Sequence, residues 1–472
     1  MGNTLRELGR LEEAAKHYTK ALKLKPEFPE ALHSFGITLT HLNKPKEAAD
    51  AIRKSLQLNP NNAPAYCDLG HAYWKVERMA EATECFVRAL KIDPEFSAAH
   101  TNMAAVHFKN NQPEDAIISA RRAIALNPND PASFNTLGGA LHQLGEIDEG
   151  YQHMVRGAAI DPDNPETRFN MGISLLMRGN FEQGWREFNY RLKNKLLKLD
   201  RGFKQPIWRG ENLDDRTLLI YSEQGLGDTV QFGRYLPHVK AKAPNVIFEV
   251  EEKLVEILRP LTGDIPIFVK GKQRLPEFDV YAPLASLPGI FGTTLETIPA
   301  DVPYLFADPD RVKWWRDRLA GSGVKVGLTW VGNPEYSNDL NRSMPLDAVR
   351  PLPSLKGIRW YSLQIGERTQ DLRAPWAAPI EDLSQEVDTF PETAAAMMNL
   401  DLIISVDTSL AHLAGALGRR VWMQLGHVAD WRWLRVRNDS PWYPTIQLFR
   451  QRSRGDWVGV IELIKNALLG QD

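Results

Sequence analysis

Prolines recur every 34 residues in the first third of the chain, as Pro26, Pro60, Pro94, Pro128 and Pro162. Small residues keep the same spacing in two further columns, Gly2, Gly36, Gly70, Ala104, Gly138 and Gly172, and Ala14, Ala48, Ala82, Ala116, Gly150 and Gly184. Small residues let two helices approach closely, and a proline ends a helix. Columns that stay in phase in this way predict a stack of two-helix units.

This period resembles the tetratricopeptide repeat (TPR), a helix–turn–helix unit whose copies stack into a superhelix. Larger apolar residues follow the same period, as Phe35, Leu69, Met103, Leu137 and Met171, and as Tyr18, Ile52, Phe86 and Met154. We expect repeats over residues 1–198, the first one incomplete because Gly2 already falls in the middle of a helix. Whether residues precede Met1 stays open. The last unit starts near Pro165 and loses its closing proline, as in a terminal repeat that docks onto another domain.

One polar column is a candidate binding surface of the repeats. Its members are Ser34, Asp68, Asn102, Thr136 and Asn170. If these side chains face the groove of the superhelix, they would hold the backbone of an extended polypeptide partner. The alternative is an exposed face that only contacts solvent.

Composition narrows the possible functions. The chain has 472 residues, of which 43% are apolar and 25% charged, and its net charge is −2. The absence of a basic excess argues against a dedicated nucleic-acid binder. No apolar run has the length of a membrane span, and no secretory signal is recognisable. Cys67 and Cys85 are the only cysteines, so we expect no disulfide framework and a cytoplasmic location.

The pattern changes after residue 216. Residues 199–216 are the expected junction; from Arg191 to Arg209 the chain is rich in Lys and Arg. Strand candidates at 217–221, 246–250, 265–269, 279–282, 325–330, 358–363, 402–406 and 421–425 then alternate with helical segments. This alternation predicts parallel sheets with helices on both faces. We expect two doubly wound lobes, 217–322 and 323–472, with a closing helix at 457–468 of the kind that often crosses back to the first lobe.

The second lobe contains the strongest candidate for an anion site. A buried strand at 402–406 is followed by Asp407-Thr408-Ser409 and then by a helical apolar stripe of Leu410, Leu413, Ala414 and Leu417. The start of a helix at the end of a parallel strand presents unpaired N–H groups and the positive end of the helix dipole. This predicts a phosphate cradle. The alternative is an ordinary βα unit in which the side-chain oxygens cap the helix.

In the first lobe, Gln224-Gly225-Leu226-Gly227-Asp228 follows the first strand and precedes a helix expected at about 229–239. Two glycines leave room for a ligand near the backbone. Their spacing differs from that of the dinucleotide-binding fingerprint, so an NAD site is not predicted. Asp228 is either a functional carboxylate facing the cleft or a helix cap.

These stretches resemble the bacterial heptosyltransferases, which have the two-lobed GT-B fold. The family carries a Gly-Asp pair, matched by Gly227-Asp228, and an Asp-Thr-Gly-x-x-His motif, matched from Asp407 to His412 with Ser409 replacing the glycine. Repeats followed by such a module also resemble O-linked N-acetylglucosamine transferases and flagellin glycosyltransferases. Trp431-Arg432-Trp433 and the segment 439–444 are landmarks of bacterial proteins of this plan, without a known role. The implied fold class is α plus α/β, a TPR superhelix followed by a GT-B module of two Rossmann-like lobes.

The resemblance implies roles for individual residues. Asp228 would be the general base that deprotonates the acceptor hydroxyl. The donor phosphate would be held by Thr408, Ser409, His412 and Arg342, the last being the one basic residue in the loop 333–343. Weaker candidates for contacts with the nucleoside are Gln364, Asp388 and Thr389, and the cleft loops would include Gln224, Gly225, Gly227 and Asp407.

The expected reaction is inverting transfer from a nucleotide-sugar, without a cofactor. No Asp-x-Asp pair follows a strand, so we expect no metal. The preferred hypothesis is transfer to a polypeptide hydroxyl, with the repeats binding the acceptor protein. One alternative is a heptosyltransferase-like enzyme acting on a glycan or lipid-linked acceptor, and another is a non-catalytic TPR scaffold. The sugar, the nucleotide and the oligomeric state stay open.

Overall fold

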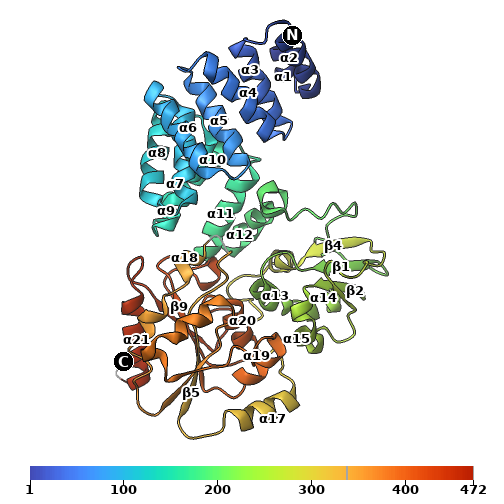
Figure 1. Ribbon diagram of the computed structural model, residues 1–472. Helices are drawn as coiled ribbons and strands as arrows, with labels where there is room; N and C mark the ends of the chain where they lie inside the picture. Colours follow the sequence, from blue (N-terminus) through green and yellow to red (C-terminus); the bar gives the residue numbers. More distant parts are fainter. Residues whose placement is uncertain (336–337, 471–472) are drawn as a thin grey trace. The chain divides into compact units, whose positions relative to one another are not determined.

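The structure is a computed structural model that describes residues 1–335 and 338–470 (Figure 1). Tyr336 and Ser337, part of the predicted phosphate-clamp loop, lie outside the described residues, as do residues 471–472. The chain divides into two compact units, Met1–Asn170 and Met171–Asp472, which are described separately.

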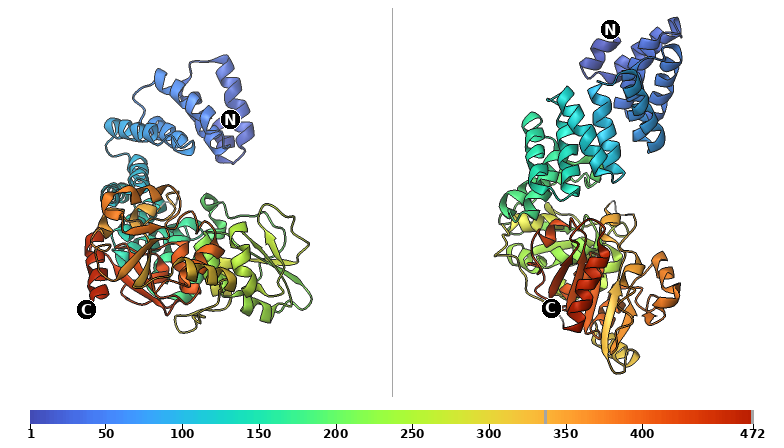
Figure 2. Two further views of the ribbon diagram at one scale, coloured as in Figure 1. Left: turned by 60° about the horizontal axis from the view of Figure 1, so that its bottom comes forward. Right: turned by 90° about the vertical axis from the view of Figure 1, so that its left-hand side faces the viewer.

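The first unit is a stack of helix pairs, shown from three directions in Figures 1 and 2. Its helices are α1 (Gly2–Glu7), α2 (Leu11–Leu24), α3 (Pro29–His41), α4 (Pro45–Leu58), α5 (Ala63–Lys75), α6 (Met79–Ile92), α7 (Ser97–Lys109), α8 (Pro113–Leu126), α9 (Pro131–Gln143), α10 (Ile147–Ile160) and the beginning of α11 (Pro165–Met177). α2 ends at Leu24, two residues before Pro26, because the residue before a proline disfavours the helical conformation. α4, α6, α8 and α10 end in the same way, which confirms the predicted two-helix units.

The glycine column marks places where the two helices of a unit touch. An added Cβ at Gly36 would lie 2.3 Å from Ile52 Cγ1, and one at Gly138 would lie 2.6 Å from Met154 Cγ. Each of these partners stands 16 residues after its glycine. Where the column has Ala104 instead, the residue 16 positions later is Ala120, and both are buried in one apolar cluster. At this contact, a residue larger than glycine on the first helix therefore requires a small residue on the second helix.

We expect Gly70→Ala to lower the free energy of unfolding by about 1–3 kcal/mol through overpacking. The new Cβ would lie 2.4 Å from Phe86 Cε1. In a Phe86→Ala background the same change should cost little, because the pair then reproduces the arrangement of Ala104 and Ala120. Chemical denaturation of the four proteins gives the coupling energy. If Gly70→Ala lowered the free energy of unfolding equally in both backgrounds, the contact with Phe86 would not be the reason for the glycine at position 70.

The side chains of the predicted groove column are half-buried, and three of the five form hydrogen bonds with a neighbouring repeat. The Asp68 carboxylate pairs with His33 Nε2 at 2.7 Å. The Asn102 side chain donates to Cys67 Sγ at 3.0 Å, and the Asn170 side chain donates to Asn135 Oδ1 at 3.1 Å. These bonds hold the first helices of adjacent units side by side. Contact of this column with a polypeptide stays a prediction.

The first lobe of the second unit has a four-stranded parallel sheet in the order β3-β2-β1-β4. The strands are β1 (Thr217–Tyr221), β2 (Asn245–Val250), β3 (Ile267–Val269) and β4 (Val280–Pro283). The helix expected at 229–239 is instead two helices, α13 (Leu226–Gly233) and α14 (Leu236–Lys242). Pro237 explains the break, since its ring would clash with the carbonyl four residues earlier, at Gly233. Trp208, in the expected junction, is fully buried and donates its backbone N–H to the Tyr281 carbonyl at 2.8 Å.

The second lobe has a six-stranded parallel sheet in the order β10-β9-β8-β5-β6-β7. Its strands are β5 (Val324–Thr329), β6 (Ile358–Ser362), β7 (Ile380–Asp382), β8 (Leu402–Val406), β9 (Val421–Leu425) and β10 (Ile446–Arg450). From β5 the chain continues through β6 and β7 on one side, and then returns to form β8, β9 and β10 on the other side of β5. In open α/β sheets, such a switch point is where ligands bind.

The second unit contains further helices and turns. They are α12 (Phe181–Phe188), α15 (Glu252–Thr262), α16 (Leu287–Ile290), α17 (Pro309–Arg318), α18 (Asp339–Arg342), α19 (Phe390–Met397), α20 (Ser409–Ala416) and α21 (Trp457–Leu469), with short 3-10 turns η1 (Asn189–Lys193), η2 (Lys195–Leu197), η3 (Leu284–Ser286), η4 (Leu346–Val349), η5 (Glu367–Arg373), η6 (Pro375–Ala377) and η7 (Trp431–Trp433). The expectation that the closing helix crosses to the first lobe is wrong. α21 buries Trp457, Val460 and Ile461 in the second-lobe core. Among the described residues, no helix combines the length and apolarity of a membrane span.

Candidate functional site

The loops that start α13 and α20 meet each other. Each follows the strand next to the switch point of its sheet, β1 in the first lobe and β8 in the second. A Cβ added at Gly227 would lie 2.9 Å from His412 Cδ2 and 3.4 Å from Ser409 Cα. Only a glycine allows the two helix starts to approach this closely. The structure thus brings the predicted Gly-Asp pair and the predicted phosphate cradle together.

Asp228 is the third residue of α13, and both of its carboxylate oxygens are engaged. Oδ2 accepts the N–H of Gly225, the N-cap residue, at 2.8 Å. Oδ1 pairs with Arg432, and 22% of the Asp228 side chain is exposed. The helix-capping alternative is therefore present, as a bond from the first turn back to the N-cap. It coexists with an ion pair to the other lobe.

Arg432 was not predicted as a site residue. It lies on η7, is buried, and donates to Gln231 Oε1 at 2.5 Å and to Asp430 Oδ1 at 2.7 Å besides pairing with Asp228. Burial opposes its charge, but the carboxylates of Asp430 and Asp228 outweigh this and raise the pKa of Arg432. A single guanidinium thus joins α13 of the first lobe to the second lobe. The only signal in the sequence was the Trp431-Arg432-Trp433 landmark.

The start of α20 lacks the side-chain cap that the alternative interpretation required. Thr408 is the N-cap residue and has an extended backbone, but its side chain makes no capping hydrogen bond. Its hydroxyl lies 3.4 Å from that of Ser405 instead. Ser409 begins the helix and is half-buried. First-turn N–H groups that the N-cap side chain leaves uncapped favour an anion at this point.

Arg342 lies at the same helix start. Its Nη1 donates to the Asp407 carbonyl at 3.1 Å, and its Nε donates to Asp339 Oδ1 at 3.0 Å. The resemblance placed a phosphate-binding cation here, and α18 brings one to the residue that precedes the α20 cap. The ion pair with Asp339 fixes the direction of the guanidinium.

His412 and Asp407 are both largely buried beneath this point. Burial, followed by the charges of Arg432, Arg234 and Arg342, lowers the pKa of His412 well below its usual value. Its Nδ1 lies 3.0 Å from the Tyr443 hydroxyl. His412 is therefore neutral near neutral pH, chiefly because it is buried and secondly because three guanidinium groups lie nearby. A contact of His412 with a ligand stays a prediction.

The carboxyl group of Asp407, beneath the same helix start, leads to a prediction about the pH dependence of stability. Burial, with the nearby Asp430 carboxylate, raises the pKa of Asp407 to about 6. Between pH of about 4 and 6 the native state therefore binds more protons than the unfolded state, so stability falls as pH rises through this window. We expect Asp407→Asn to raise the free energy of unfolding at pH 7.5 by about 2–3 kcal/mol and to remove this slope.

Urea denaturation of the wild type and the variant at several pH values measures both effects. Asp439→Asn is the control, because Asp439 is exposed and its pKa is lowered by a hydrogen bond from Arg437. A wild-type stability that rises between pH of about 4 and 6 relative to Asp407→Asn would contradict the prediction.

Two of the three weaker candidates, Gln364 and Thr389, make hydrogen bonds within the protein, and the third, Asp388, lies beside Thr389. Gln364 is buried at the end of β6, where its Oε1 accepts the N–H groups of Trp330 at 3.2 Å and Val331 at 3.0 Å. Thr389 caps α19 by accepting the Glu392 N–H at 3.4 Å. Asp388 is exposed beside it, and Gln224 is half-buried in the first-lobe loop. Nucleoside contacts of Gln364, Asp388 and Thr389, and the place of Gln224 in the cleft, stay predictions.

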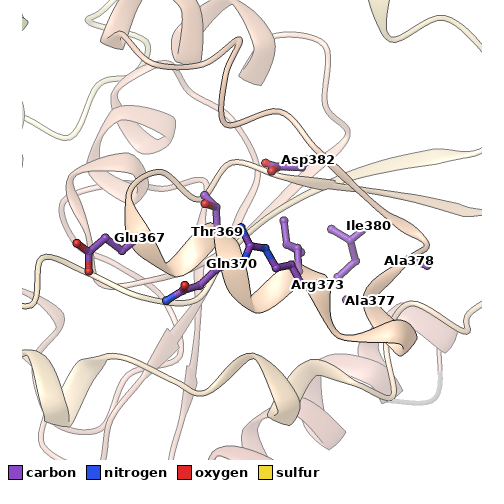
Figure 3. Close-up of a pocket in the computed structure, with 9 residues that line it drawn as sticks. Glu367, Thr369, Gln370, Arg373, Ala377, Ala378, Ile380 and Asp382 are labelled. Atoms are coloured by element: carbon purple, nitrogen blue, oxygen red, sulfur yellow. The ribbon is translucent and has the colours of Figure 1, made fainter.

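A cavity of about 780 Å³ lies beside η5, η6 and β7 (Figure 3). Its lining residues are Glu367, Thr369, Gln370, Leu372, Arg373, Ala377, Ala378, Ile380 and Asp382. None of the residues predicted from the sequence is among them. This cavity is therefore separate from the predicted constellation around Asp228 and α20.

Comparison with known proteins identifies the repeats. The TPR repeat model matches residues 2–43, and models of the tetratricopeptide repeat match residues 29–62, 63–96 and 101–165. The predicted repeats are confirmed there. Protein FlbA of Caulobacter vibrioides is 27% identical over 289 residues, 55% of this chain and 48% of FlbA. The chain thus matches about half the length of this curated relative.

Solved structures resemble parts of the chain. YrrB, described as a TPR protein with an unusual peptide-binding site, is 26% identical with a TM-score of 0.31 and covers 38% of this chain and 92% of its own. The TPR protein TTC0263 of Thermus thermophilus is 23% identical with a TM-score of 0.33 and covers 37% and 95%. MamA is 23% identical with a TM-score of 0.31 and covers 34% and 95%.

Proposed function

We propose that this chain, tetratricopeptide repeats followed by an α/β module with two parallel sheets, is a glycosyltransferase. It moves a sugar from a nucleotide-sugar to a polypeptide hydroxyl. The module has the GT-B plan, with the donor bound by the second lobe, and the repeats bind the acceptor protein in the cytoplasm. Repeat arrays offer long binding surfaces rather than small pockets, which favours a polypeptide acceptor.

One observation carries this proposal. The start of α20, without a side-chain cap, touches Gly227 and so lies beside Asp228. Arg342 and Arg432 contact the same two loops. A helix N-terminus beside the Arg342 guanidinium is suited to a phosphate group, and a carboxylate across from it, oriented by Arg432, is suited to receive a proton. Inverting transfer needs these two functions on opposite sides of one reacting carbon.

The chemistry then follows from the positions. Asp228 accepts the proton of the acceptor hydroxyl, and the hydroxyl oxygen attacks the anomeric carbon. The bond from that carbon to the phosphate oxygen breaks, with inversion. The α20 N-terminus, Thr408, Ser409 and Arg342 stabilise the leaving phosphate. The helix start and Arg342 supply the charge that a metal would otherwise provide, so the proposed reaction needs none.

Thermal stability in the presence of ADP, UDP, GDP and CMP tests donor binding. The matching nucleotide at about 100 times its Kd should add about 2.7 kcal/mol of stability. Intact-mass analysis of candidate acceptor proteins co-expressed with the transferase then tests polypeptide transfer. A nucleotide response without any modified protein would favour the glycan or lipid-linked acceptor.

A second function has its own supporting observation. Both oxygens of Asp228 are engaged by the protein itself, as expected of a residue that only joins two lobes. A non-catalytic TPR scaffold would keep this ion pair and bind no nucleotide. The absence of a thermal response to all four nucleotides would favour it over the transferase.

A further inference from the structure

The end of the last repeat enters the second unit as α12 and η1. Arg191, on η1, is fully buried and pairs with Glu223 Oε1 at 2.5 Å, with 1% of the Glu223 side chain exposed. The same guanidinium donates to Ser286 Oγ and to Asn189 Oδ1, each at 2.8 Å. A fully desolvated ion pair is costly to form, and an apolar pair often stabilises a core equally well. The presence of this pair therefore indicates that the protein needs one defined geometry around Glu223.

Glu223 stands at the point where that geometry matters. It follows β1 and immediately precedes the loop 224–228, which ends in Asp228. Arg191 therefore holds the beginning of this loop, and the bond from the Gly225 N–H to Asp228 Oδ2 closes its other end. The direction of the Asp228 carboxylate depends on both anchors.

α12 also contacts the segment that carries Arg432. The ring of Trp185 lies edge-on to that of Trp431, with centroids 5.3 Å apart. Trp431 in turn stacks on Phe232 of α13, with centroids 6.5 Å apart. The Trp185 indole N–H donates to the Thr293 carbonyl at 2.9 Å, which fixes its orientation. α12 thus contacts the segment that carries Arg432 directly and α13, which carries Asp228, through Trp431.

We infer that Arg191 is a positioning residue that orients Asp228 through Glu223, so that the terminal repeat forms part of the candidate site. The inference rests on the proposed function for its catalytic consequence, but its structural consequence is independent of activity. Loss of the Arg191–Glu223 pair releases the loop 224–228 while the donor cradle at α20, held by the second-lobe sheet, keeps its place.

The variants separate positioning from stability. Arg191→Met alone leaves a buried carboxylate without its cation and is expected to impair folding. Arg191→Met/Glu223→Gln removes both charges and keeps similar volumes, so it is the variant to measure, together with Arg191→Lys. The matched control is Arg201→Met/Glu249→Gln, which removes a pair of the same lobe at 2.6 Å whose Glu249 side chain is 3% exposed.

Hydrogen–deuterium exchange of the peptide 223–230 is the primary readout. We expect exchange in the Arg191/Glu223 double variant to be about tenfold faster, with the control within about twofold of wild type. Unchanged exchange, or equal acceleration in the control, would overturn the inference. This outcome does not depend on whether the protein is a transferase.

Steady-state kinetics then tests the catalytic consequence. In the double variant kcat should fall about 10- to 100-fold because the base is misplaced, while KM for the nucleotide-sugar stays within about twofold. Arg191→Lys, which keeps the charge, should recover part of the loss. Faster exchange with an unchanged kcat would overturn the role of Arg191 towards Asp228. If the wild type transfers no sugar, the proposed function fails and the exchange result alone decides whether Arg191 orders the loop.

Discussion

Replacing Asp228 with alanine is expected to lower the rate of sugar transfer by about 10²- to 10⁴-fold, the usual contribution of a general base. The reason is that Asp228 is the proposed proton acceptor beside the start of α20, where Gly227 meets Ser409. The nucleotide should still bind with nearly the wild-type Kd, because the cradle is built from the second lobe. Single-turnover rates and titration calorimetry measure the two quantities separately.

The control for this experiment is Asp439→Ala. Asp439 is an exposed carboxylate, with 67% of its side chain accessible, and it also pairs with an arginine, Arg437. Its loss removes one ion pair without touching α13 or α20. If Asp228→Ala retained full turnover, Asp228 would have no part in the chemistry, and its ion pair with Arg432 would be purely structural.

The repeats were predictable because each structural need recurs with the chain's own period. A glycine faces a large residue, and Pro26 and its equivalents end the second helices. Among the large residues that face the glycines, one position is an alanine, Ala120. It faces Ala104, the one alanine of the glycine column. Local rules of helix packing thus account for the pattern, so no long-range information was needed.

The strands were most clearly predictable where they are buried on both faces. β8 is buried throughout and reads as a continuous apolar run. The edge strands β7 and β10 were missed because both contain polar residues, whereas the edge strand β3, which is as short as β7, is wholly apolar and was predicted. The end of α13 was also missed, although Pro237 marked it.

The site was predictable in its loops and not in its partners. Asp228 and the start of α20 were found because each sits where a strand turns into a helix. Arg432 lies 204 positions from Asp228 along the chain. Its role depends on how the two lobes face each other, which no local pattern encodes. For the same reason the sequence placed Arg191 in a basic junction rather than in a buried pair.

Arg432→Met is expected to lower stability substantially. It would leave Asp228 and Asp430 without their shared cation and Gln231, which is fully buried, without the donor to its Oε1. Breaking a buried pair usually costs about 3–5 kcal/mol, and because the two carboxylates are partly exposed we expect about 3 kcal/mol. Urea denaturation measures the loss.

The same variant also separates the proposed functions. If Arg432 contributes to holding a diphosphate, Arg432→Met should lose most of the nucleotide-dependent stabilisation, and Arg432→Lys should keep part of it as a single point charge. Arg437→Met, which removes an exposed pair, should leave both stability and nucleotide response near wild type. A variant that is destabilised but keeps the full nucleotide response would confine Arg432 to joining α13 to η7. The diphosphate would then depend on Arg342 and the α20 N-terminus alone.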